Sequence, residues 1–138
     1  MAVRVRNIMS GSVECIGQYE TLQKAAGMMK DLDVGALPIC GEDQRLKGMI
    51  TDRDIVVKCH AEGSDPRDFQ ADDFAQGEPV TVGADDDIDT ALRTMQDARV
   101  RRLPVIDGPE LVGMLSQADI ARNIPDDRVG ELVAFLSY

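Results

Sequence analysis

The sequence predicts a mixed α/β (α+β) fold made of two tandem copies of one β-α-β-β-α unit. The first observation is an internal repeat, because Leu37-Pro38-Ile39 recurs as Leu103-Pro104-Val105 in the second half of the chain. The second is the alternation of short apolar runs with segments whose apolar residues have helical spacing. The third is size, since 138 residues with 43% hydrophobic residues are enough to bury a core.

Further identities keep the same order along both copies. The offset between matched residues is constant up to the Leu-Pro segment and shorter by one residue after it, so a single gap in a turn relates the copies. An ordered set of this kind predicts a duplicated supersecondary unit. The matched pairs are Gly17 and Gly83, Ala25 and Ala91, Met29 and Met95, Asp31 and Asp97, Val34 and Val100, Leu46 and Leu111, Gly48 and Gly113, Met49 and Met114, Asp54 and Asp119, and Ile55 and Ile120.

Each copy is expected to contain the same five elements in the same order. A strand opens it, a helix with one apolar face follows, and two strands joined by a short turn lead into a second helix. In the first copy these are a strand at 13–16, a helix bearing Leu22, Ala25, Ala26 and Met29, strands at 37–40 and 46–50, and a helix from Thr51. In the second they are a strand at 80–82, a helix bearing Ile88, Ala91, Leu92 and Met95, strands at 103–106 and 111–115, and a helix from Ser116.

This order predicts a parallel strand pair followed by an antiparallel hairpin in each copy. Three strands make a small sheet, so we expect the two copies to pack together about a pseudo-twofold axis. The expected divisions are a first domain at 7–60, an acidic linker at 61–73 with a short helix near 66–74, a second domain at 74–124, and a C-terminal helix at 125–138 whose apolar stripe is either a packing surface or a dimer contact.

Charge argues against several classes of partner. The net charge is −10, and the segment 61–90 holds one Lys or Arg against ten Asp or Glu, so the middle of the chain is acidic. Nucleic-acid binding needs a basic face, and the chain has few aromatic residues for stacking, so no nucleic-acid partner is expected. We also expect no membrane span and a cytoplasmic location, since the N-terminus shows no apolar signal region.

The repeated segments resemble the CBS domain pair, also called a Bateman module, over roughly residues 7–123. The resemblance rests on a strand-to-helix motif, Gly-h-h-Thr/Ser-x-x-Asp, in which h is an apolar residue. It is present as Gly48-Met49-Ile50-Thr51-Asp52-Arg53-Asp54 and as Gly113-Met114-Leu115-Ser116-Gln117-Ala118-Asp119. The segments at 35–41 (GALPICG) and 49–56 (MITDRDIV) make the chain similar to the small stand-alone CBS-pair proteins of actinobacteria. The family implies tandem packing of the copies and a flat homodimer formed through helices.

Two interpretations of Thr51 and Asp54 remain open, and the same holds for Ser116 and Asp119. The structural one is a capping box, in which the hydroxyl and the carboxylate bind each other's backbone N–H. The functional one is a ligand site, because a helix start favours phosphate and a carboxylate can accept both hydroxyls of a ribose. The resemblance to CBS pairs implies an adenosine-containing ligand, AMP, ADP, ATP or S-adenosylmethionine, in the cleft between the copies.

A basic cluster, Arg99, Arg101 and Arg102, stands at the Leu-Pro strand of the second copy. It either complements the preceding helix dipole or binds phosphate. The first copy has the neutral Val34-Gly35-Ala36 there, so the two potential sites are not equivalent. If one nucleotide binds, we expect it to use Asp54 and Arg53 together with Arg101 or Arg102.

The three cysteines are Cys15, Cys40 and Cys59, and the single histidine is His60. Cys15 and Cys40 fall near the ends of two adjacent parallel strands, so they are either a disulfide or near-contact, or two buried thiols. Cys59 is expected to stay free. We expect no metal site, because Cys59 and His60 cannot complete a tetrahedral zinc site alone, and no catalytic residues, because no triad can be assembled.

Two functions fit these features. One is a regulatory CBS-pair module that senses an adenosine-containing ligand and signals to an unknown effector protein, as a homodimer and without being an enzyme. The other is a ligand-free stress-response or interaction protein with a redox-sensitive Cys15–Cys40 pair.

Overall fold

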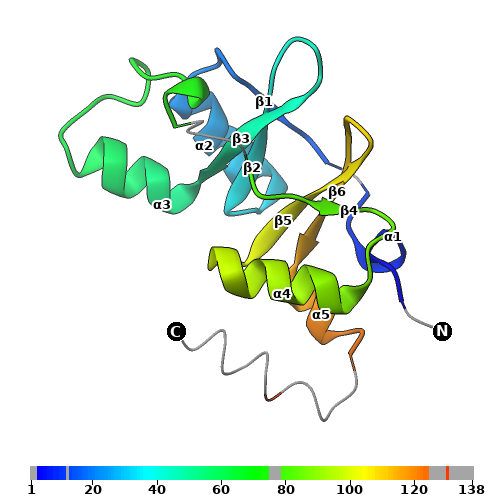
Figure 1. Cartoon of the computed structure of the whole chain (residues 1–138). Coiled ribbons are helices and arrows are strands. Elements are labelled where there is room, and N and C mark those ends of the chain that lie inside the picture. Colours follow the sequence, from blue (N-terminus) through cyan, green and yellow to red (C-terminus); the bar gives the residue numbers. More distant parts are fainter. Residues whose placement is uncertain (1–2, 12, 75–78, 125–129, 131–138) are drawn as a thin grey trace. The chain divides into compact units, whose positions relative to one another are not determined.

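The computed structural model describes residues 3–11, 13–74, 79–124 and 130 (Figure 1). Its contacts divide the chain into two compact units. The first-copy unit is Glu14–Pro79, and the second-copy unit joins Met1–Val13 to Val80–Tyr138. Among the described residues, no helix has the length and apolar content needed to cross a membrane.

The first-copy unit contains a three-stranded sheet in the order β1-β2-β3. β1 pairs with β2 in parallel and β2 with β3 antiparallel, as the β-α-β-β order predicts. Its elements are β1 (Ile16–Gly17), α2 (Leu22–Leu32), β2 (Ala36–Cys40), β3 (Leu46–Thr51), α3 (Asp52–Asp54), the π-helical η1 (Ile55–His60) and the 3₁₀-helical η2 (Ala71–Phe74).

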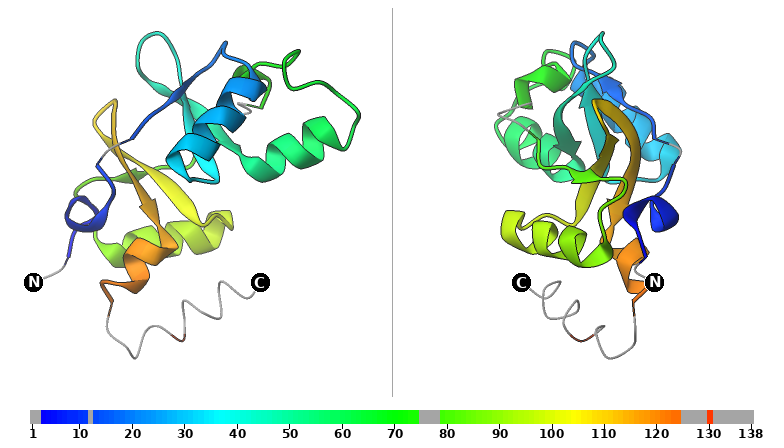
Figure 2. Two further views of the ribbon diagram at one scale, coloured as in Figure 1. Left: turned by 180° about the vertical axis from the view of Figure 1, so that it is seen from behind. Right: turned by 45° about the vertical axis from the view of Figure 1, so that its right-hand side comes forward.

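The second-copy unit repeats this topology in the order β4-β5-β6, which confirms the predicted tandem fold. Figure 2 shows α2 and α4 each lying against the sheet of its own unit. The elements are α1 (Val5–Ile8), β4 (Val82–Gly83), α4 (Ile88–Ala98), β5 (Arg102–Asp107), β6 (Glu110–Ser116) and α5 (Gln117–Ala121).

The two long helices begin and end at matching residues. Thr21 caps α2 by accepting from the Lys24 amide, and Asp87 caps α4 by accepting from the Thr90 amide. Both helices end at a left-handed residue, Asp33 with φ 55° and Arg99 with φ 57°. Polar caps and local turn chemistry therefore place these helices identically in both units.

Each unit has its own apolar core. All four predicted residues of α4 are buried, and so are Leu22, Ala25 and Met29 of α2. The prediction that Ala26 lies on the buried face of α2 is wrong, because Ala26 is exposed. The half-buried Met28 packs against that core instead, so the helix is rotated relative to the expected face.

Both opening strands are shorter and later than predicted. The expected strands at 13–16 and 80–82 are instead Ile16–Gly17 and Val82–Gly83. The physical reason is the chain path, since the chain passes between the two units next to Val13 and next to Pro79. The residues just before each strand therefore connect the two units and form no strand pairing.

The expected linker helix near 66–74 forms only at its end, as η2. The carbonyls of Pro66 and Phe69 accept hydrogen bonds from Gln23 and Leu22 at the start of α2, at 3.2 and 3.0 Å. Because these carbonyls serve another helix, residues 66–69 make turns. The predicted C-terminal helix at 125–138 lies outside the described residues, apart from Gly130.

The two short helices α1 and η2 are exchanged between the copies. Val5 and Arg6 donate backbone hydrogen bonds to the carbonyls of Asp86 and Ala84, at 2.9 and 2.8 Å. The matching bonds in the first-copy unit run from Ala71 and Asp72 to Glu20 and Gln18, at 2.8 and 2.7 Å. Every donor and acceptor is displaced by the same offset that relates the two copies, so α1 and η2 are equivalent. The segment before Val13, whose residues from 7 onward were expected in the first domain, thus packs in the second-copy unit (Figure 1).

The residues after α1 also explain the glycine of the second motif. Ser10 exchanges two backbone hydrogen bonds with Met114, at 2.9 and 3.0 Å. A Cβ atom built on Gly113 would lie 2.8 Å from the Ser10 carbonyl oxygen. The N-terminal segment can cross β6 this closely because Gly113 has no side chain.

Candidate functional site

The first junction, defined as Thr51–Asp54, links β3 to α3. Thr51 Oγ1 accepts from the Asp54 amide at 3.0 Å, and Asp54 Oδ2 accepts from the Thr51 amide at 3.0 Å. This is a complete capping box, so the structural interpretation of the motif is confirmed. The neighbouring strand places Ala36 opposite Thr51.

The second junction, defined as Ser116–Asp119, links β6 to α5 in the same way. Ser116 Oγ accepts from the Asp119 amide at 3.1 Å, and Asp119 Oδ2 accepts from the Ser116 amide at 2.9 Å. The two aspartates therefore have matched geometry, because each commits its Oδ2 atom to the cap and leaves Oδ1 available for another partner.

A basic residue one helical turn later holds each available oxygen. Lys58 Nζ lies 3.2 Å from Asp54 Oδ1, and Arg122 Nη2 lies 2.7 Å from Asp119 Oδ1. The carboxylate side chains are 23% and 15% exposed, whereas those of Lys58 and Arg122 are 56% and 68% exposed. Ion pairs with such exposed cations contribute little stability, so an incoming hydrogen-bond donor can replace the cation at low cost.

Two of the predicted arginines lie beside the second junction. Arg102 is paired with Ser116 across β5 and β6, and the Arg101 carbonyl accepts from the Gln117 amide at 3.1 Å. Both side chains are exposed. The structure thus brings Arg101 and Arg102 together with Ser116 and Asp119 in one unit.

The first junction lacks that basic pair. Gly35 and Ala36 occupy the places of Arg101 and Arg102, and the Gly35 carbonyl accepts from the Asp52 amide at 2.9 Å. Arg53 is exposed on the first turn of α3. Thr51, Arg53 and Asp54 gather in the first-copy unit, so the predicted residues form two clusters with different charge.

Sequence reasoning missed three residues at the junctions. The i,i+4 and i,i+3 spacings from the aspartates are the signal that could have identified Lys58 and Arg122. No spacing in the sequence identifies Gln117, because its burial depends on residues that pack against it from elsewhere in the fold. It is 7% exposed, and its Nε2 atom is buried without a hydrogen-bond partner among the described residues.

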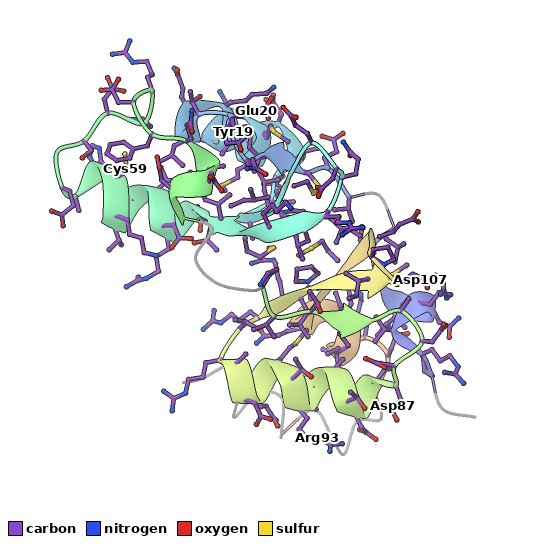
Figure 3. All side chains as sticks on the ribbon, turned by 45° about the horizontal axis from the view of Figure 1, so that its top comes forward. Tyr19, Glu20, Cys59, Asp87, Arg93 and Asp107 are labelled. Atoms are coloured by element: carbon purple, nitrogen blue, oxygen red, sulfur yellow. A yellow bond between two sulfur atoms is a disulfide. The ribbon has the colours of Figure 1, made fainter. Side chains whose placement is uncertain are left out.

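Of the two alternatives for Cys15 and Cys40, the structure has the disulfide, with Cα atoms 5.7 Å apart. Cys40 ends β2 as expected, but the expected place of Cys15 near the end of its strand is wrong, because Cys15 precedes β1 and the ladder pairs Gly17 with Cys40. Cys59 is buried and free, as predicted (Figure 3). No group of three or more His, Cys, Asp or Glu side chains that could hold a metal ion occurs within the described residues.

Two βαββα units, each with a capped strand-to-helix junction, define the chain as a CBS-pair module. The CBS domain family model matches residues 5–60 and 71–126, and the chain belongs to this family. The two matches begin at Val5 and Ala71, which are the first residues of α1 and η2. CBS-domain proteins are generally regulatory and non-catalytic, and this chain is a CBS-pair regulatory module.

Several relatives extend along nearly the whole chain. Hypoxic response protein 1 of Mycobacterium tuberculosis is 46% identical over 128 residues, which are 93% of this chain and 90% of that protein. A CBS domain-containing protein of Bacillus subtilis is 32% identical over 97% of this chain and 95% of its own length. These matches confirm the resemblance to small stand-alone CBS-pair proteins.

Solved structures agree with this assignment. The crystal structure of Hypoxic Response Protein I, which contains two coordinated zinc ions, has a TM-score of 0.82 and 46% identity, covering 89% of this chain and all of that one. The hexameric CBS-CP12 protein of bloom-forming cyanobacteria has a TM-score of 0.81 and 27% identity, covering 94% of this chain and 71% of that one.

Proposed function

We propose that this chain is a sensory module that binds an adenosine-containing ligand through its motif aspartates and signals to a partner protein. The observation that carries the proposal is the state of Asp54 and Asp119. Each carboxylate is fixed by its cap through Oδ2, while Oδ1 contacts only a displaceable surface cation among the interactions described above. A ribose diol can donate to such an oxygen in place of the cation.

Arg101 and Arg102 support a phosphate-bearing ligand. They are exposed cations beside the Ser116–Asp119 junction in a chain of net charge −10. Guanidinium groups bind phosphate with two parallel hydrogen bonds, so this pair favours AMP, ADP or ATP over an uncharged nucleoside. The sequence expectation adds Arg53 and Asp54 to the ligand contacts.

The test is isothermal titration calorimetry with AMP, ADP, ATP and S-adenosylmethionine on the full chain. We expect Asp54→Asn and Asp119→Asn to separate the two junctions, because asparagine keeps an oxygen for the cap but loses the charge. Loss of two charge-assisted hydrogen bonds weakens binding by about 2–4 kcal/mol at the junction that is used, and the sequence favours Asp54. Asp31→Asn, on the exposed face of α2, is the matched control.

Two results would contradict the proposal. One is the absence of heat from all four ligands, and the other is unchanged binding in both junction variants. Arg101→Gln and Arg102→Gln should weaken ATP more than S-adenosylmethionine, since only the former carries phosphates. An equal loss of affinity for ATP and S-adenosylmethionine would show that these arginines do not bind phosphate.

The disulfide favours a second candidate, a ligand-free stress-response protein controlled by the oxidation of Cys15 and Cys40. Cytosolic disulfides act more often as redox sensors than as permanent links. Peptide mapping of non-reduced protein, before and after mild oxidation, tests this candidate. A protein that binds no nucleotide but changes its partners with oxidation would favour it over the first.

We also propose a homodimer. Val56 and Val57 on the helix after the first junction are 56% and 42% exposed, which leaves apolar surface for a second chain. Among solved relatives, the CBS-CP12 protein is hexameric. This proposal assigns no surface of the chain to the binding of the effector protein.

A further inference from the structure

The exchange of α1 and η2 allows one surface to be compared in both units. In the second-copy unit this surface carries the guanidinium of Arg6. Its Nε atom lies 3.1 Å from Asp85 Oδ1, and its Nη2 atom lies 3.0 Å from Asp107 Oδ2. The pairing with Asp85 and Asp107 raises the pKa of Arg6 above its usual value, and Arg6 lowers the pKa of Asp85. An internal cation therefore fills this place.

The equivalent surface of the first-copy unit keeps neither this arginine nor its two carboxylate partners. The offset that relates the two copies puts Asp72 at the place of Arg6, Tyr19 at the place of Asp85, and Gly41 at the place of Asp107. A pocket of about 350 Å³ is present there. It is lined by Gln18, Tyr19, Glu42, Asp43 and Lys47, and we call it the Tyr19 pocket.

Gly41 allows three of these side chains to approach one another. A Cβ atom at Gly41 would lie 2.5 Å from Lys47 Cε, 2.7 Å from Gln18 Oε1 and 2.9 Å from Asp43 Oδ1. The aspartate that the second copy carries here would not fit without moving them. Gly41 is therefore one difference between the two copies at the wall of this pocket.

The charge of the Tyr19 pocket is negative. Lys47 Nζ lies 3.2 Å from Asp43 Oδ2, so this pair neutralises itself. Glu42 in the wall and Asp72 on the adjoining η2 are exposed, and no side-chain bond to either occurs in the described part of the chain. Asp72 is held next to the wall by its backbone bond to Gln18. One uncompensated carboxylate, that of Glu42, thus lines the pocket, and a second, that of Asp72, belongs to a segment whose backbone is bonded to the pocket wall.

An aromatic ring completes the surface. Tyr19 is 59% exposed, and Figure 3 shows it beside Glu20, near the start of α2. A planar cation can stack on such a ring while carboxylates accept its N–H groups. Arginine meets both conditions better than lysine, because its guanidinium is flat and presents several donors.

We propose that the Tyr19 pocket binds an arginine side chain of a basic segment on a partner protein, which would stack on Tyr19 and donate to Glu42. The site is separate from the motif junctions and does not depend on nucleotide binding. The acidic chain as a whole favours a basic partner, because complementary charge speeds association. The pocket adjoins the disulfide, since Gln18 donates its amide to the Cys40 carbonyl at 3.0 Å.

The probe is N-acetyl-arginine amide, titrated into the full-length, isotope-labelled protein and followed by NMR. We expect its addition to shift the amides of Tyr19, Gly41 and Lys47, with millimolar affinity for a single side chain. The uncharged isostere N-acetyl-citrulline amide should leave them unchanged. The double variant Glu42→Gln with Asp72→Asn should bind at least threefold more weakly, and Asp31→Asn should bind as the natural chain does.

The other unit supplies a positive control. Arg6→Ala leaves Asp85 and Asp107 without their cation, so the same probe should then also shift those two residues. Binding at Asp85 and Asp107 in this variant without binding at the Tyr19 pocket would overturn the proposal. So would equal shifts from the citrulline probe, or an unchanged affinity in the double variant, and the spectra themselves report whether each variant is folded.

Discussion

Opening the Cys15–Cys40 bond should lower the stability of the first-copy unit by a predictable amount. The two cysteines are 25 residues apart in sequence, and the bond encloses β1, α2 and β2. In the chain-entropy model a loop of this length restricts the unfolded chain by about 3.5 kcal/mol. Cys59 is buried and free, and it is not expected to replace either partner.

The assay is urea unfolding followed by far-ultraviolet circular dichroism, with and without reductant. With a slope of about 1–3 kcal/mol per molar urea, the reduced protein should unfold at a midpoint lower by about 1–3 M. The double variant Cys15→Ala with Cys40→Ala is the matched control, because its midpoint should not respond to reductant. Coincident curves for the oxidised and reduced natural chain, or a linkage of Cys59 to either cysteine in peptide mapping, would refute the reasoning.

Three further predictions concern the exchanged helix and the assembly. Val5→Ala should destabilise the protein by about 2 kcal/mol in urea, because a fully buried side chain loses two methyl groups, whereas Val3→Ala, at a residue 40% exposed, should cost under about 0.5 kcal/mol. Arg6→Gln should lower the stability at pH 7, because the Arg6 guanidinium holds the pKa of Asp85 below its usual 3.8. The difference from the natural chain should persist down to that pH and then shrink as Asp85 is protonated in stronger acid, and a difference that does not change with pH in acid would contradict the ion pair. Light scattering at micromolar concentration should give the mass of two chains, and a monomeric mass would count against the homodimer.

The sequence was sufficient to predict the features that local chemistry controls. The hydroxyl and carboxylate at Thr51 and Asp54 are three residues apart, and this spacing alone predicts the capping box that forms. The apolar spacing of Ile88, Ala91 and Met95 likewise predicts the buried face of α4. The expected crossover of two parallel strands made the disulfide one of two open alternatives for Cys15 and Cys40, and it did not predict the register of the two strands.

The exchanged helices could not be predicted in this way. The four residues of α1, Val-Arg-Asn-Ile, share no identity with the Ala-Asp-Asp-Phe of η2, so an identity search sees no repeat there. Their equivalence rests on backbone hydrogen bonds to matching carbonyls of the two copies, and any amino acid except proline can donate such a bond. Long-range packing determines which unit α1 joins. Val5 is fully buried in the second-copy unit, although α1 lies next to the first copy in sequence.

The reciprocal placement of α1 and η2 has the form of a domain-swapped dimer whose two chains have been joined end to end. A fragment cut at residue 60 would keep a helix with no surface to pack on and would expose the surface that η2 covers. The smallest piece of this chain that can satisfy its own backbone is therefore both copies together. Because one polypeptide carries both copies, the exchange of α1 and η2 is independent of protein concentration, whereas two separate copies would dissociate on dilution.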